Sequence, residues 1–297
     1  MNRALAWEAD GPAWPHSAAS RFVDAAGLRW HVQIKGKGPV MVLVHGTGAS
    51  THSWRGCVDR LARGFTVVVP DLPGHGFTEL PDNDRLSLPG MAAALLALLA
   101  ELKVKPAVVV GHSAGAAIAV RAALDGGIHP KAIVSLNGAL MPFPGLASFA
   151  FPALAKVLFL NPFAVPIAAR LAIDPDAVAS VIRRTGSEID GEDLAYYTRL
   201  FADRRHIAAT IGMMANWDLS SLRDDIHALK PRLTLVSDDT DLAVPPWVAR
   251  AVKERLPAAR IIALSGQGHL AHEKSPKLIC DLIESCAFEA GVKFERR

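Results

Sequence analysis

The chain has 297 residues, of which 51% are hydrophobic and 21% are charged, and its formal net charge at pH 7 is +3. This composition supplies a large core and excludes extended disorder, and the lack of any run of five like charges argues against nucleic-acid binding. We therefore expect a folded protein whose partner is a small molecule.

The sequence shows no sign of export or of a disulfide framework. Its cysteines, Cys57, Cys280 and Cys286, include no C-x-x-C pair, which indicates reduced thiols inside a cell. The first residues hold acids and prolines where a signal peptide needs an apolar run. The longest clean apolar stretch, ten residues from Met91, is too short to cross a bilayer. We expect a cytoplasmic protein without a transmembrane segment, with contact at a membrane surface left open.

Strand and helix patterns alternate along the chain. Short runs rich in β-branched residues predict strands at residues 28–34, 40–44, 65–69, 108–110, 132–136, 233–236 and 261–264. Helix formers at helical spacing predict helices at residues 88–102 and 114–124 and from residue 276. Strands separated by helices indicate an α/β fold with a mostly parallel sheet that helices cover on both faces.

The alternation stops between residues 141 and 223. This stretch begins with an apolar segment that five prolines interrupt, and the rest of it has a helical pattern without a convincing strand. We interpret residues 141–223 as a helical cap inserted into a core domain formed by residues 1–140 and 224–297. A helical subdomain without a role in binding is the alternative. The position favours a cap, because the insertion follows a strand at the same sheet edge as the glycine-rich turns.

Residues 107–118 read AVVVGHSAGAAI, and in them a buried strand turns into a helix around Ser113. Gly111 and Gly115 flank the turn, so the serine lies at its apex beside the free N–H groups of the helix. The motif G-x-S-x-G is weak alone, but the strand and the helix supply the context that a nucleophile elbow needs. Ser113 is the candidate nucleophile of an acyl-transfer site.

Such a nucleophile needs a base and a group that orients the base. The segment SGQGHLAHE follows a predicted strand and places His269 in a glycine-flanked loop, with His272 as the alternative in a more helical position. The segment VSDDTDLAVP follows another strand and offers Asp238, Asp239 and Asp241, although acids after a strand are often turn formers. The chain order of serine, aspartate and histidine is that of the nucleophile-elbow hydrolases.

The turn HGTGAS follows the strand at residues 40–44. It can direct a backbone N–H at the elbow, so we expect the N–H groups of Thr47 and Ala114 to form an oxyanion hole, although a plain tight turn would also explain the glycines. Other chemistries lack their motifs: the chain has no P-loop, no complete G-x-G-x-x-G and no zinc-protease signature around His269 and His272. We expect neither a metal nor a cofactor.

The segments VLVHGTGAS, PDLPGHGFT, VGHSAG, DLAVP and GQGHLAHEKSP resemble, in order and spacing, the α/β-hydrolase fold family over essentially the whole chain. The resemblance implies that Asp241 completes a triad with Ser113 and His269 and that Thr47 lends an oxyanion N–H. Serine at the elbow, where haloalkane dehalogenases and epoxide hydrolases have aspartate, argues against their chemistry. Thr78 stands where the family often has serine, which puts no catalytic residue in doubt.

A narrower resemblance involves the segments HGTGASTHSWR, GHSAGAAIA, MPFPGLA and MMANWDL. They look like the magnesium-chelatase accessory proteins of bacteriochlorophyll biosynthesis, a family labelled a 30 kDa chelatase subunit. The resemblance implies a role in a tetrapyrrole pathway of photosynthesis, a cytoplasmic location near the membrane and contact with magnesium chelatase. It does not establish a reaction, and without a P-loop the chain cannot itself supply a P-loop motor for magnesium insertion.

A large flat apolar ligand such as a porphyrin is consistent with the aromatic and methionine content of the predicted cap. The residues expected to line its cavity are Phe143, Phe149, Phe151, Phe159, Phe163, Tyr196, Tyr197, His206, Met213, Met214 and Trp217. Core packing is the alternative reading for many of them. The function expected is a serine hydrolase acting on an apolar ester-like substrate. A non-catalytic tetrapyrrole-binding protein that assists the chelatase is the main alternative, and a perhydrolase or C–C bond hydrolase is a third.

Overall fold

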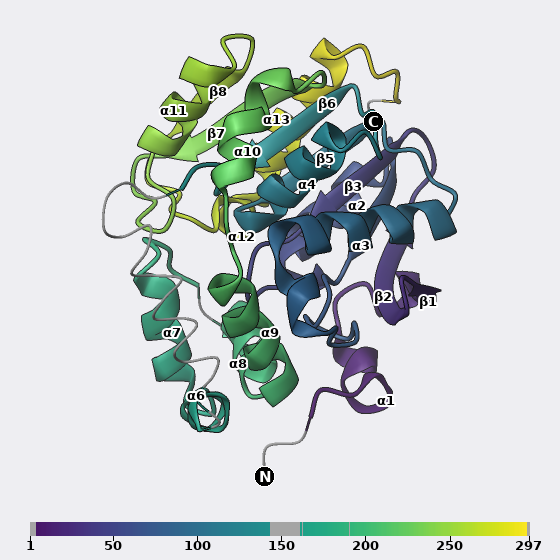
Figure 1. The fold of residues 1–297 in the computed structure, drawn as a ribbon. Helices are drawn as coiled ribbons and strands as arrows, with labels where there is room; N and C mark the ends of the chain where they lie inside the picture. The colour runs from purple at the N-terminus through teal and green to yellow at the C-terminus, as the bar shows by residue number, and fades with distance from the viewer. Residues whose placement is uncertain (1–3, 143–160, 162, 190, 296–297) are drawn as a thin grey trace.

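The computed structural model describes residues 4–142, 161, 163–189 and 191–295 (Figure 1). Four of the expected cavity-lining residues, Phe143, Phe149, Phe151 and Phe159, lie outside these ranges. Within the described residues, no helix is long and apolar enough to cross a membrane.

The described residues contain an eight-stranded sheet with the strand order β1-β2-β4-β3-β5-β6-β7-β8. The strands are β1 (Ser20–Ala25), β2 (Leu28–Lys35), β3 (Val40–Val44), β4 (Thr66–Pro70), β5 (Val108–His112), β6 (Ala132–Leu136), β7 (Arg232–Asp238) and β8 (Arg260–Leu264). β1 pairs antiparallel with β2, and β2 pairs antiparallel with β4. All the other neighbours in the sheet are parallel. The predicted mostly parallel sheet is confirmed.

The first strand was missed by the sequence prediction. Its sequence, SRFVDA, carries two charged residues, and most of its side chains are half-buried or exposed because it forms the edge of the sheet. It turns into β2 at Ala26 and Gly27, which both have positive φ. Because β1 contains few apolar residues, its hydrophobic pattern predicts a strand much less clearly than the valine runs of β4 and β5 do.

Twelve α-helices accompany the sheet in the described part of the chain. They are α1 (Trp7–Asp10), α2 (Arg55–Leu61), α3 (Leu88–Glu101), α4 (Ala114–Leu124), α6 (Ala164–Leu171), α7 (Pro175–Arg183), α8 (Gly191–Phe201), α9 (Arg204–Ala215), α10 (Ser220–Asp225), α11 (Trp247–Arg255), α12 (Ala271–Lys274) and α13 (Pro276–Glu289). The predicted helix at residues 114–124 has the observed bounds of α4.

The sheet separates two hydrophobic cores, because successive side chains of a strand point to opposite faces. Val42 and Val44 of β3 pack in the core that contains α3, α4, α10 and α11. Met41 and Leu43 of the same strand pack in the core that contains α2 and α13. Figure 1 shows α3 and α4 in front of the sheet and α13 behind it. Coverage of both faces explains why the central strands are almost entirely apolar.

The helices α6 to α9 follow β6 in the chain and lie together beside the sheet (Figure 1). A Cβ atom added at Gly48, after β3, would lie 3.3 Å from the ring of Phe201 in α8. A Cβ atom added at Gly74, after β4, would collide with Ala209 in α9. These two helices therefore cover the ends of β3 and β4 that carry the glycine-rich turns. The division into core and cap at residues 141 and 223 stays a prediction.

Candidate active site

Ser113 is the single residue between β5 and α4, and its backbone conformation is strained. Its φ of 51° and ψ of −120° are uncommon for a residue with a side chain and cost on the order of 1–3 kcal/mol. Its N–H donates to the carbonyl oxygen of Leu136 at 3.0 Å, and its carbonyl oxygen accepts from Ala116 and Ala139, each at 3.1 Å. Ser113 is half-buried, whereas the four residues around it, Gly111, His112, Ala114 and Gly115, are buried. The turn holds the serine outward at a fixed position.

The turn after β3 packs directly against this elbow. A Cβ atom added at Gly46 would lie 3.0 Å from the Cβ atom of Ser113 and 2.9 Å from Nδ1 of His112. A Cβ atom added at Gly115 would collide with the carbonyl oxygen of Val44. Only glycine allows the two backbones to approach this closely. The proposed oxyanion-hole turn and the proposed nucleophile are therefore neighbours.

The turn at residues 46–48 is held through its carbonyl groups. The Nδ1–H of His45 donates to the carbonyl oxygen of Gly46 at 2.8 Å, while its Nε2 accepts from Leu72 N. The Nε2–H of His206 in α9 donates to the carbonyl oxygen of Gly48 at 3.0 Å, while its Nδ1 accepts from Gly76 N. Burial lowers the pKa of His45 and brings the pKa of His206 to about 4, so both imidazoles are neutral near pH 7. His206 thus fastens α9 to the turn, and both of its ring nitrogens have protein partners.

Thr47 and Ala114 keep their backbone N–H groups available. Among the described residues, neither N–H donates to a protein acceptor. Ala114 is the first residue of α4, where helical N–H groups have no partner within the helix. The hydroxyl of Thr47 is used elsewhere, since it donates to Sδ of Met213 at 3.3 Å.

His269 and Asp241 form a buried hydrogen bond. Nδ1 of His269 lies 2.8 Å from Oδ2 of Asp241, and the Asp241 side chain is inaccessible to solvent. The other carboxylate oxygen, Oδ1, accepts from the backbone N–H groups of Ala243 and Val244, both at 2.8 Å. With Nδ1 engaged by the carboxylate, Nε2 of His269 is the nitrogen left to take a proton.

The other two aspartates of this loop have different partners. Asp238 accepts from Thr240, Gln267 N and Gly268 N, and Asp239 accepts from Ser265 and Gly266 N. Burial opposes ionisation of Asp238, but these hydrogen bonds outweigh it and lower the pKa of its carboxyl group. Both acids brace the loop that precedes His269, and of the three only Asp241 binds the imidazole.

His272 packs against His112, the residue before Ser113, and hydrogen-bonds to none of the three aspartates. Its ring is buried, with its centroid 4.4 Å from that of His112, and burial lowers its pKa to about 3. His112 stands between the two histidines: its ring lies 4.6 Å from that of His269, and its Nε2–H donates to the His269 carbonyl oxygen at 2.9 Å. The residue before Ser113 therefore holds the backbone of His269, which favours His269 over His272 as the base.

The expected cavity-lining residues that the structure describes have different surroundings, and their role in binding a ligand stays a prediction. Tyr196 donates to Glu192 at 2.6 Å, and Met214 and Phe163 are exposed. Trp217 packs against the core that contains α3 and α4. Met213 is fully buried. Among the described members of this group, it is the one that hydrogen-bonds to Thr47, a residue proposed for the oxyanion hole.

Tyr197 belongs to a buried network that the sequence did not predict. Its hydroxyl donates to Oε1 of Glu273 in α12 at 2.7 Å. Arg55 of α2 contacts Oε2 of Glu273 at 3.2 Å and also pairs with Asp193 of α8. Burial raises the pKa of Glu273 to about 7 against the opposing effects of Tyr197 and Arg55. The network joins α8 to the helix that directly follows the His269 loop.

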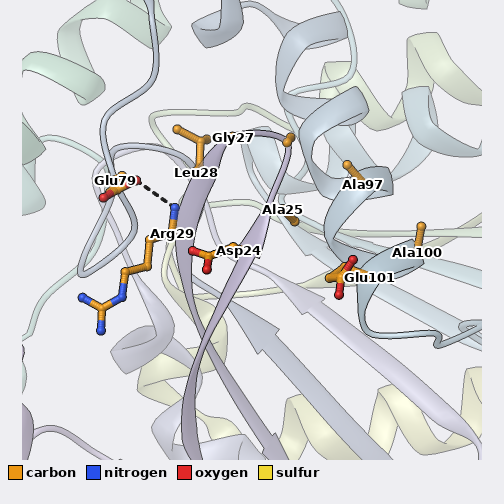
Figure 2. A pocket seen from close by; sticks show the side chains of 10 residues that line it. Asp24, Ala25, Gly27, Leu28, Arg29, Glu79, Ala97, Ala100 and Glu101 are labelled. Carbon is orange, nitrogen blue, oxygen red and sulfur yellow. Dashed lines mark hydrogen bonds between the residues drawn. The ribbon is translucent and has the colours of Figure 1, made fainter.

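A hollow of about 760 Å³ lies elsewhere, between the β1–β2 turn and the end of α3 (Figure 2). Asp24, Glu79 and Glu101 line it, and Glu79 accepts a hydrogen bond from Arg29 N at 2.8 Å. None of the proposed catalytic residues lines it. The residues that the structure describes also hold no group of three or more His, Cys, Asp and Glu side chains suited to a metal ion.

Comparisons with known proteins identify the family. Residues 41–282 match the model of the alpha/beta hydrolase family. A magnesium-chelatase 30 kDa subunit of Rhodobacter capsulatus is 37% identical over 262 residues, which cover 88% of this chain and 91% of that protein. A pimeloyl-[acyl-carrier protein] methyl ester esterase of Aeromonas hydrophila subsp. hydrophila is 29% identical over 262 residues, or 84% of this chain and 95% of that protein.

Solved structures agree with this assignment at the level of the fold. The epoxide hydrolase CorEH superposes with a TM-score of 0.78 at 22% identity, over 91% of this chain and 98% of that one. The expected fold and both resemblances are thereby confirmed. The chain belongs to the alpha/beta hydrolase family.

Proposed function

We propose that this protein is a serine hydrolase that acts on an apolar ester-like substrate. In this proposal Ser113 is the nucleophile, His269 is the general base and Asp241 orients the imidazole. The observation that carries it is the buried 2.8 Å hydrogen bond between His269 and Asp241, beside an elbow serine with a strained backbone. A strained conformation kept at the apex of a turn is typical of functional sites.

The reaction proceeds in two halves. His269 takes the proton of Ser113 at Nε2 while Oγ attacks the ester carbonyl, and the tetrahedral intermediate then expels the alcohol, which receives that proton. Water attacks the acyl-enzyme in the same way and releases the carboxylic acid and free Ser113. Asp241 stays ionised and stabilises the imidazolium formed in each half.

The oxyanion is bound by backbone donors. The N–H groups of Thr47 and Ala114 have no protein acceptor among the described residues, and Gly46 lies against Ser113. Fixed donors aimed at a developing oxyanion each contribute roughly 10²- to 10³-fold to turnover. The hydrogen bonds from His45 and His206 to the carbonyl groups of the turn keep it in place.

Hydrolysis of p-nitrophenyl esters of increasing chain length, together with labelling by a fluorophosphonate, tests this proposal. Ser113→Ala should remove both activities without loss of folding. Turnover and labelling that persist in this variant would refute the proposal. Adding ring-cleavage diketones and peroxide to the substrate panel separates an esterase from a C–C bond hydrolase or a perhydrolase, which use the same three groups.

The structure offers a matched control at Ser20. Its Oγ lies 2.9 Å from Nε2 of His31, and Nδ1 of His31 lies 2.7 Å from Oδ2 of Asp71, so a second serine, histidine and aspartate are connected. The His31 ring is buried among Trp7, Phe22 and Phe77. Ser20→Ala should therefore keep labelling and turnover at the level of the unmodified protein.

A second function is favoured by the 37% identity with the magnesium-chelatase 30 kDa subunit. In this proposal the protein binds a magnesium tetrapyrrole or its precursor in bacteriochlorophyll biosynthesis and contacts the chelatase in the cytoplasm at the membrane surface. Titration with protoporphyrin and its magnesium form, and the chelatase rate with and without the protein, test it. Saturable binding or a changed rate supports it, and the absence of both refutes it. A porphyrin ester as the hydrolysed substrate would unite the two functions.

A further inference from the structure

Asn137 occupies a special position next to the proposed triad. It is the first residue after β6, its side chain is buried, and its φ of 47° lies in the left-handed region. Its N–H donates to the carbonyl oxygen of Val236 at 2.8 Å, which extends the pairing of β6 with β7. Asparagine and glycine tolerate this conformation better than other residues. The backbone here is anchored to the strand that leads to Asp241.

The side-chain amide of Asn137 joins the acid loop to the base loop. Nδ2 donates to Oδ2 of Asp241 at 2.6 Å and to the carbonyl oxygen of Gly268 at 3.1 Å. Oδ2 is the same oxygen that lies 2.8 Å from Nδ1 of His269, and Gly268 is the residue before His269. One buried amide therefore contacts both loops that meet at the imidazole.

We propose that Asn137 is a positioning residue of this site, which holds the Asp241 carboxylate against His269 and limits the negative charge that His269 feels. Its link to turnover rests on the proposed function. A carboxylate oxygen that accepts from two donors shares its charge between them. Removing this donor leaves more of that charge to stabilise the imidazolium.

Several ionisable groups surround the imidazole. Asp241 contacts Nδ1, and Asp238 on the preceding loop binds Gly268 N. On the other side lie His112 and His272, and burial lowers the pKa of both well below the range of ordinary histidines, so both are neutral. Among the described residues, Asp241 is thus the acidic group in direct contact with the His269 ring. The Asn137 amide that donates to Oδ2 of Asp241 can therefore change how strongly this carboxylate stabilises the protonated imidazole.

Two variants separate the amide from the backbone role. Asn137→Gly keeps a residue that accepts the left-handed conformation and removes the amide. Asn137→Ala also removes the amide, but alanine tolerates the positive φ less well than glycine. A nearby like or opposite charge typically shifts a titration by about one to three pH units. We expect the acidic limb of the pH profile of kcat/KM to move upward by up to about one unit in both variants. In Asn137→Gly, kcat should fall about tenfold or more.

NMR titration of the His269 imidazole in the same proteins gives a readout that needs no turnover. His269→Gln assigns its resonance, and thermal unfolding checks that each variant folds. An upward shift of the His269 titration in both variants supports the proposal even if Ser113 proves inactive as a nucleophile, in which case only the proposed function fails. Unchanged His269 titration in a folded variant without the amide would overturn it, whatever the esterase activity. If one of the two variants fails to fold, the other decides.

Discussion

Replacing Glu273 with glutamine tests how the buried network under α8 responds to pH. In the folded protein burial raises the pKa of this carboxyl group from 4.5 to about 7. That difference corresponds to about 3 kcal/mol at 1.36 kcal/mol per unit. Between pH 4.5 and 7 the folded state holds a proton that the unfolded chain has released, so the free energy of unfolding falls as pH rises through this window. Glutamine has no proton to lose, and the variant lacks this contribution.

The assay is urea unfolding at a series of pH values from 5 to 8, followed by tryptophan fluorescence. We expect the stability of the unmodified protein relative to Glu273→Gln to fall by up to about 3 kcal/mol across the series. Glu101→Gln, at an exposed residue of α3, controls for the loss of one carboxylate. Tyr197→Phe removes the hydrogen bond that opposes the rise in the Glu273 pKa, so the fall in stability should continue to a higher pH. Parallel stability curves for Glu273→Gln and the unmodified protein would refute this reasoning.

Three further predictions concern the elbow and its supports. Burial opposes ionisation of Asp71, but His31 and the backbone N–H of Phe77 outweigh it and lower the pKa of its carboxyl group from 3.8 to about 2 in the folded state. This shift contributes about 2 kcal/mol that is present above pH 4 and lost as pH falls through 2. Asp71→Asn should therefore lower the unfolding temperature at pH 7 much more than at pH 2, and equal effects in calorimetry would contradict this. Ser113→Gly should relieve the positive φ and raise stability by about 1 kcal/mol while removing ester hydrolysis. A lower melting temperature would count against a strained elbow. Gly46→Ala should reduce kcat at least about 100-fold with little change in KM, because its Cβ would press on the Ser113 side chain and displace the turn. Steady-state kinetics showing a changed KM with unchanged kcat would argue against this role.

The fold could be predicted largely from local patterns. The valine runs of β4 and β5 and the alanine-rich α4 carry their structure in their own sequence, and α4 has the predicted bounds. β1 was missed because this edge strand pairs with one neighbour and contains few apolar residues, so its sequence lacks a clear strand pattern. The choice of Asp241 over Asp238 came from the family pattern, since three aspartates within four residues look alike until their partners are known.

The surroundings of the site could not be predicted, because they depend on contacts between distant segments. Asn137 lies 104 residues from Asp241, and Glu273 lies 76 residues from Tyr197. Asn137 does leave a weak signal, as a polar residue directly after a buried strand and before a glycine. For the helical residues expected to line a cavity, the sequence gives no signal of what their side chains contact. A tyrosine or methionine looks the same in the sequence whether it faces a ligand or, like Tyr197, a buried acid.

The most direct test of the account is to trap the acyl-enzyme with an ester substrate, quench in acid and locate the acylated residue by peptide mass spectrometry. The account predicts one acyl group on Ser113, lost in Ser113→Ala and accumulating more slowly in Asp241→Asn. An acyl group on Ser20 or another residue, or hydrolysis with no covalent intermediate, would contradict it.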